Sequence, residues 1–219
     1  MTGQTRQPDA ERGTEEITTE RLIFFSDAVV AIAITLLAFA LPVPSGSTTS
    51  AVLRSFHDKG SAYLAFVISF LVIGSHWRSH HRLFRKVERL DPAVTALNMA
   101  WLFLIVIQPF ATRVLAGNGA FGLRFSLYAF LQVATLLCFL LMARLMRRLR
   151  AEPEVAGSDM RLLTFVAFFA VSIPLSFVTH WAYLCWLAAS VAARVEEQWR
   201  KRREAGSGQA GNGSPGPRL

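Results

Sequence analysis

The chain has 219 residues, of which 53% are apolar and only 17% are charged, and its formal net charge is +8. A water-soluble domain carries about 25% charged residues, spread along the chain between apolar positions. Here the charges are clustered between long apolar stretches, so the composition excludes an ordinary soluble globular domain. Positive charge beside apolar stretches is typical of membrane topology, so we expect no nucleic-acid partner.

Six apolar stretches are candidates for membrane-spanning helices, since a helix needs about 20 mostly apolar residues to cross the hydrocarbon core. Every backbone polar group in lipid needs an internal partner, and continuous apolar runs without two-residue alternation exclude a β-barrel. The sequence therefore predicts an all-α membrane protein with six transmembrane helices per subunit and with membrane lipid around it. In chain order the stretches are Leu22–Leu41, Ser61–Trp77, Ala93–Leu115, Phe125–Met146, Leu162–Val178 and Trp181–Val195.

Polar segments flank these spans and divide the chain into three parts. We expect residues 1–17 and 204–219 to form disordered cytoplasmic tails around a six-helix domain of residues 18–203. Met1–Glu20 is polar and contains acids, so no signal peptide is evident and the first helix is expected to direct insertion.

Residues that end or begin helices divide the spans. Pro42, Pro44 and the residues up to Ser50 predict an outer loop after the first span. Asp91 followed by Pro92 predicts a capped helix start, because aspartate accepts from free N–H groups and proline fits the first helical position. Gly117–Gly119 predicts a tight outer turn, and residues 151–158 an inner one.

The basic residues orient the bundle. With the N-terminus in the cytoplasm, all but four of the 23 Lys and Arg residues fall on the cytoplasmic side of a six-span arrangement. Cytoplasmic loops carry the excess of Lys and Arg, so both termini are expected in the cytoplasm. The four residues on the outer side are Arg54, Lys59, Arg113 and Arg124.

The first span contains Asp27, an acidic residue well inside a transmembrane segment. Such a residue is costly in lipid and should face protein or water. A helical periodicity of 3.6 residues puts one set of residues on a common face, and it turns Ser26 and Asp27 well away from that face. The common face consists of Phe25, Ala28, Ile32, Thr35, Leu36 and Phe39.

Partners for Asp27 are available near the cytoplasmic ends of the next two spans. The second span ends in His76-Trp77-Arg78-Ser79-His80-His81, and Asn98 lies near the start of the third. A buried network that links Ser26 and Asp27 to Trp77, one of these histidines and Asn98 would satisfy the polar groups and join the helices. A direct role in proton or cation passage is the alternative interpretation.

Other chemistry finds little support. His76 and His80 are spaced like a zinc-binding pair, but no third ligand is near them in the sequence, so we expect no tightly bound metal. Cys138 and Cys185 are interpreted as packing residues. No nucleophile elbow, phosphate-binding glycine loop or pair of intramembrane carboxylates is present, so we expect no enzyme and no cofactor.

At Phe25-Ser26-Asp27 the chain resembles the prokaryotic members of the transmembrane-protein-175 family of potassium channels. The resemblance extends from Arg21 through the first span to Pro42. It continues with Ser69-Phe70, His76-Trp77-x-x-His80-His81, Asn98 and Pro109-Phe110. It covers the first three spans closely, and the last three only in number and length.

The resemblance implies a homotetramer in a prokaryotic cell membrane, with the first helix of each subunit lining a central pore. It implies a constriction at Ile32, further rings at Leu36 and Phe39, and a role for Thr35 in potassium preference, with potassium passing transiently near Ile32 and Thr35. The family usually has an aliphatic residue at the position of Phe39. A structural polar network beside the pore is implied for Arg21, Phe25, Ser26, Asp27, Trp77, His80, His81 and Asn98.

The predicted function is therefore a potassium-permeable cation channel, modestly selective over sodium because no carbonyl-filter motif is present. One alternative is a proton-coupled secondary transporter that uses Asp27 and the histidines of the second helix. Another is a membrane scaffold whose basic loops bind anionic lipid.

Overall fold

The computed structural model of the chain describes residues 7–85, 91–149 and 156–179, all in helices or in the segments that connect them. The helices in chain order are α1 (Gln7–Phe39), α2 (Thr49–Asp58), α3 (Gly60–Phe84), α4 (Pro92–Ala116), α5 (Phe121–Leu149) and α6 (Ala156–Ser176).

Among the described residues, four helices are long and apolar enough to cross a membrane: α3, α4, α5 and the Thr19–Phe39 part of α1. The apolar part of α6, Leu162–Ser176, is shorter. The expected sixth span, Trp181–Val195, lies outside the described residues. The prediction of an all-α, multi-pass membrane protein is confirmed, and the number of six spans stays a prediction.

The helix boundaries follow local signals in the sequence. Asp91 caps α4 as expected, since its side chain accepts a hydrogen bond from the Ala93 N–H at 2.7 Å, and Pro92 occupies the first turn. Gly119 has a φ of 121°, a conformation that favours glycine, in the turn between α4 and α5.

Three segments differ from the expected boundaries. The outer loop after the first span contains α2, which begins where the Thr48 hydroxyl accepts from the Ala51 N–H at 3.2 Å. Residues 7–17, expected in a disordered tail, form the first turns of α1. α6 already begins at Ala156, inside the segment expected to form an inner turn.

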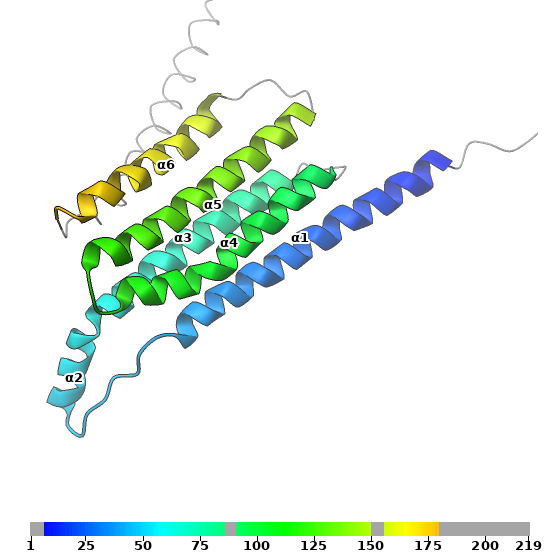
Figure 1. Cartoon of the computed structure of the whole chain (residues 1–219). Helices are drawn as coiled ribbons and strands as arrows, with labels where there is room; N and C mark the ends of the chain where they lie inside the picture. The colour runs from blue at the N-terminus through cyan, green and yellow to red at the C-terminus, as the bar shows by residue number, and fades with distance from the viewer. Residues whose placement is uncertain (1–6, 86–90, 150–155, 180–219) are drawn as a thin grey trace, which may run out of the picture.

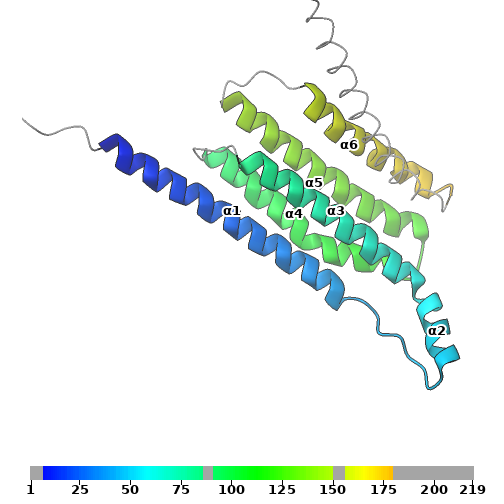
Figure 2. The same cartoon turned by 180° about the vertical axis from the view of Figure 1, so that it is seen from behind.

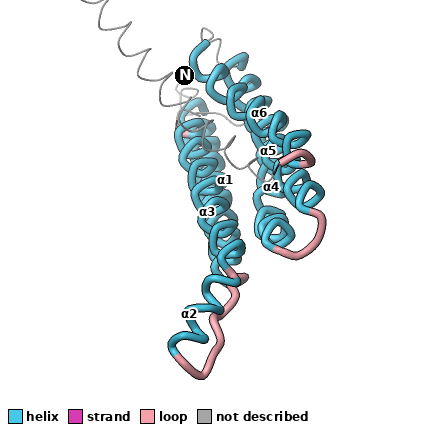
Figure 3. The backbone as a smooth tube through the Cα atoms, turned by 90° about the vertical axis from the view of Figure 1, so that its left-hand side faces the viewer, coloured by secondary structure: helices cyan, strands magenta, loops and turns pink. Residues whose placement is uncertain are grey.

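The long helices lie side by side with alternating direction, and α4 is central among them (Figures 1 and 2). α4 packs against α1, α3 and α5, while α6 packs against α5. Viewed from the side, α1 and α3 form one part of the bundle and α4 to α6 the other, with α2 projecting beyond the end of α3 (Figure 3).

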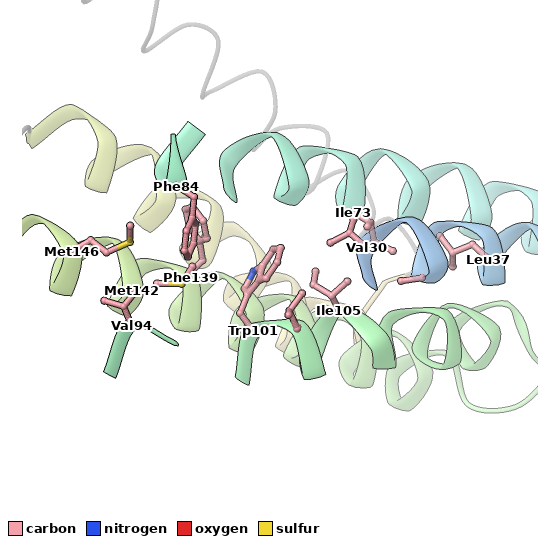
Figure 4. Packing of buried hydrophobic residues seen from close by; sticks show 12 residues of the cluster. Val30, Leu37, Ile73, Phe84, Val94, Trp101, Ile105, Phe139, Met142 and Met146 are labelled. Atoms are coloured by element: carbon pink, nitrogen blue, oxygen red, sulfur yellow. The ribbon is translucent and has the colours of Figure 1, made fainter. Parts of the chain in front are cut away.

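Apolar packing joins four helices around Trp101 of α4, whose side chain is completely buried (Figure 4). α1 contributes Val30, Ala33 and Leu37 to this cluster. The other members come from α3, α4 and α5: Ile73, Phe84, Val94, Leu102, Ile105, Phe139, Met142 and Met146. The core thus fixes one face of α1 against α3 and α4.

Candidate functional site on the first membrane helix

The two faces of α1 have opposite surroundings. Val30, Ala33 and Leu37 are at most 2% exposed and pack into the core. On the other face Ile32 is 59% exposed and Phe39 is 90% exposed. The subunit therefore presents an apolar face of a membrane helix that no described segment of the chain covers.

This exposed face contains every residue that the helical periodicity grouped with Ile32. Phe25, Ala28, Thr35 and Leu36 are all exposed. The Thr35 hydroxyl donates to the Ile32 carbonyl oxygen at 2.8 Å. Because its hydrogen is used in this bond, the Thr35 oxygen can act only as an acceptor toward other groups. The face is apolar with one hydroxyl oxygen per subunit.

The buried face of α1 carries a polar network to α3 and α4, which we call the first network. The Trp77 indole N–H of α3 donates to Asp27 Oδ1 at 2.9 Å. The Asn98 amide of α4 donates through Nδ2 to Ser26 Oγ at 3.0 Å, and its Oδ1 lies 2.8 Å from His80 Nε2. Ser26 and Asn98 have no exposed surface at all.

Hydrogen-bond directions in the first network determine the state of His80. Because Asn98 Nδ2 donates to Ser26, its Oδ1 must accept, so His80 carries a proton on Nε2. The Ser26 hydroxyl donates a hydrogen bond to the Leu22 carbonyl oxygen at 2.8 Å. Nε2 of His80 thus donates within the network, while its buried Nδ1 has no hydrogen-bond partner among the described residues.

Aromatic rings hold His80 in place from both sides. Its ring stacks on Trp101 at a centroid distance of 4.6 Å and on Phe84 at 4.4 Å. A histidine packed in this way presents Nε2 to Asn98 in a fixed orientation.

Some residues expected in this network lie beside it. The His81 ring stacks on Trp77 at a centroid distance of 5.8 Å, and no side-chain hydrogen bond of His81 is found within the described part of the chain. Arg21 is exposed, and Phe25 is 53% exposed on the opposite face of the helix. The structure therefore brings together Ser26, Asp27, Trp77, His80 and Asn98, while Arg21 and Phe25 stand apart.

The paired histidines of α3 do not converge on a common point. His80 Nε2 faces Asn98, whereas His76 Nε2 lies 3.3 Å from Gln132 Oε1 of α5. Within residues 7–85, 91–149 and 156–179 no three His, Cys, Asp or Glu side chains are placed to hold a metal ion.

A second buried network was not predicted from the sequence. It joins α3, α4 and α5, and it is built from neutral amides, hydroxyls and one imidazole. Gln132 Nε2 donates to Gln108 Oε1 at 2.9 Å. The members of this second network are Ser69, His76, Gln108, Thr112, Tyr128, Gln132 and Thr135, all buried. Their only signal in the sequence is a glutamine or histidine within an apolar span.

Residues 21–109, which contain α1 from Arg21 onward, α2, α3 and most of α4, match the family described as endosomal/lysosomal potassium channel TMEM175. A protein of Streptomyces collinus named as a potassium channel is 36% identical over 54% of this chain and 60% of its own length. Another such protein, of Chamaesiphon minutus, is 40% identical over 47% of this chain and 51% of its own length. The chain thus spans between 48% and 60% of the first three curated relatives that it matches.

A solved structure is similar over nearly its whole length. It is the crystal structure of a protein described as a lysosomal potassium-selective channel TMEM175 homolog from Chamaesiphon minutus. The sequence identity is 30% and the TM-score 0.69, and the match covers 83% of this chain and 97% of that one.

Proposed function

Because the chain belongs to the TMEM175 family of channels, we propose that it forms a potassium-permeable cation channel with a modest preference for potassium over sodium. The resemblance stated from the sequence is confirmed, and the family is one of channels and not of enzymes. Relatives from Streptomyces and Chamaesiphon that are named as potassium channels support potassium as the permeant ion.

The observation that carries this proposal is the contrast between the two faces of α1. One face is held by the core and by the first network, and the other is apolar and exposed. A helix that lines a pore must keep a fixed position, because its position sets the pore radius, and the first network restrains α1 in this way.

We propose that four copies assemble with their α1 helices around a central axis. In such an assembly each exposed α1 face meets the other copies and the ion path. The subunit would lie in the cell membrane of a prokaryote with both termini in the cytoplasm, as the distribution of basic residues predicts.

The proposed ion path is narrowest at a ring of Ile32, with Leu36 and Phe39 forming rings further out. Apolar constrictions of this kind gate by dewetting. The Thr35 oxygens, one helical turn from Ile32, would replace part of the hydration shell of a potassium ion. Since a few hydroxyls compensate dehydration less completely than a carbonyl filter does, the selectivity should be modest.

The alternative of a proton-coupled transporter depends on Asp27 and the histidines changing their protonation. In the first network Asp27 accepts a hydrogen bond from Trp77, and His80 Nε2–H donates one to Asn98. These bonds support a positioning role for Asp27 instead of a relay.

Single-channel recording in planar bilayers under a potassium/sodium gradient tests the proposal. We expect discrete openings with a reversal potential on the potassium side, and a higher unit conductance for Ile32→Asn because a polar ring resists dewetting. A selectivity ratio above about a hundredfold would contradict a pathway without a carbonyl filter.

Leu71→Asn is the matched control, since Leu71 is 64% exposed on α3, outside the proposed pore wall. Equal conductance of Ile32→Asn and Leu71→Asn would place the constriction elsewhere. Silence of the wild type in well-folded preparations would remove the channel proposal.

A further inference from the structure

The second network lies entirely between α3, α4 and α5 and contains no residue of α1. All of its members are at most 6% exposed, although each bears a polar side chain. Buried polar groups in a membrane bundle are retained where they join helices at defined positions.

One branch of the network runs in a single direction. Gln132 Nε2 donates to Gln108 Oε1, so Gln132 Oε1 is an acceptor and His76 Nε2 donates to it. Gln108 Nε2 in turn lies 3.5 Å from Thr135 Oγ1. The Thr135 hydroxyl donates to the Leu131 carbonyl oxygen at 2.7 Å. Donors and acceptors are matched from α3 to α5.

A second branch reaches the same helices further along. Thr112 Oγ1 lies 2.8 Å from both Ser69 Oγ of α3 and the Gln108 carbonyl oxygen. Ser69 Oγ lies 3.0 Å from the hydroxyl of Tyr128 on α5. α3 is therefore joined to α4 and α5 at two levels, near Ser69 and near His76.

The level at His76 adjoins the contacts that hold α1. His76 and Trp77 are consecutive in α3, yet His76 faces Gln132 of α5 while Trp77 faces Asp27 of α1. One turn later, His80 reaches Ser26 of α1 through Asn98. The residues 76–80 of α3 thus connect α5 on one side with α1 on the other.

We propose that Gln132 is a positioning residue for the ion path, which acts through His76 and Trp77 on the α1 helix. This inference rests on the proposed channel function. Gln132 fixes the rotation of α3, and α3 holds the buried face of α1 away from the proposed axis. When this restraint is loosened, α1 moves toward the axis, and a ring of Ile32 side chains that comes closer together dewets more readily.

The test compares Gln132→Met with Leu131→Met in single-channel recordings. Methionine has nearly the shape of glutamine but makes no amide hydrogen bond, and Leu131 is a buried apolar neighbour on the same helix. We expect Gln132→Met to lower the ratio of open to closed time by about fivefold, equivalent to about 1 kcal/mol. The unit conductance and ion preference of the remaining openings should not change, and Leu131→Met should behave as the wild type.

A double-mutant cycle with Trp77→Phe separates this linkage from a general loss of packing. If Gln132 acts through α3 on Asp27, the combined variant should lose less than the product of the two single effects. Independent, multiplicative effects would overturn the linkage. Thr135→Val removes only the end of the branch and should lower the ratio of open to closed time by a smaller factor. This variant replaces Gln132→Met in the test if Gln132→Met does not fold.

A distance measurement makes the outcome independent of recorded openings. Spin labels at Phe24→Cys of α1 and Arg78→Cys of α3, both exposed positions, report the spacing of the two helices once Cys138 and Cys185 are replaced by alanine. Gln132→Met, or Thr135→Val in its place, should broaden this distance distribution, and Leu131→Met should not. An unchanged width of the distance distribution would overturn the proposed role of Gln132 even if the wild type conducts. A broader distribution together with a silent wild type would reject only the channel function.

Discussion

The two polar networks each contain an amide of α4, but they differ in what the amide joins. Asn98 stands between α3 and α1, in a network that includes the half-buried Asp27 and the partly exposed Trp77. The Gln108 amide bonds to Gln132 and Thr135 of α5, and its backbone carbonyl accepts from Thr112, in a network that is neutral and buried throughout. The charged network reaches the helix with the exposed face, and the neutral one holds the helices behind it.

The largest effect is expected for Asn98→Leu. The leucine keeps the branched shape but leaves the His80 Nε2–H without its acceptor and Ser26 Oγ without the donor Asn98, although the Ser26 hydroxyl still donates to Leu22. An unpaired buried group costs about 1–3 kcal/mol, so unfolding in detergent should show a loss of about 2 kcal/mol. A variant as stable as the wild type would mean that the first network does not hold α1.

A smaller loss is expected for Gln108→Met. Gln108 accepts a bond of 2.9 Å from Gln132, but its own donor reaches Thr135 only at 3.5 Å. The same unfolding measurement should give a loss of about 1 kcal/mol, since one good hydrogen bond is removed. A larger loss than for Asn98→Leu would reverse the ranking of the two networks.

Trp77→Phe should lower the free energy of unfolding by less than Gln108→Met does. Trp77 is 39% exposed, so its bond to Asp27 is only partly enclosed by the subunit. We expect a loss of about 0.5 kcal/mol in unfolding. His81→Ala is the comparison variant, because it removes only the ring that stacks on Trp77.

Asp27→Asn should have the smallest effect, because asparagine keeps an oxygen that accepts from the Trp77 indole. Stability and unit conductance should stay close to those of the wild type. Complete loss of ion flux in a folded Asp27→Asn protein, together with proton-coupled uptake by the wild type, would favour the transporter alternative. This measurement separates a positioning carboxylate from a proton carrier.

The sequence predicted the first network well because its central residue is unusual. An aspartate within an apolar span is costly, so it indicates polar partners at the same depth, which were Trp77, Asn98 and one histidine of the second span. The structure shows that this histidine is His80. Arg21 and Phe25 were included by resemblance alone, and the structure places them on exposed surface. Motif membership did not tell which side of the helix each residue faces.

The second network escaped prediction for the opposite reason. Gln108 and Gln132 are neutral, and a single amide in an apolar span has no obvious partner until the register of the helices is known. Hydrogen-bond complementarity between α4 and α5 is a property of the packed bundle and not of either span.

The positions of the four long spans followed from composition, since lipid thickness sets the number of apolar residues, but α3 continues past the predicted end at Trp77 to Phe84. α2 was missed because Pro42, Pro44 and the serines before it indicated a loop, and the loop ends at the Thr48 cap. A helix of ten residues without a buried side chain leaves no apolar stretch long enough to notice.

The position of two amides on one helix also bears on how the bundle assembles in lipid. Apolar side chains slide past one another in a bilayer with little preference, because lipid tails are as apolar as they are. Asn98 and Gln108 each require a partner at one height on a different neighbour, so a shift of α4 by a single turn would break both sets of bonds. The hydrogen bonds of these two residues thus select one register of α4 when the inserted helices first associate.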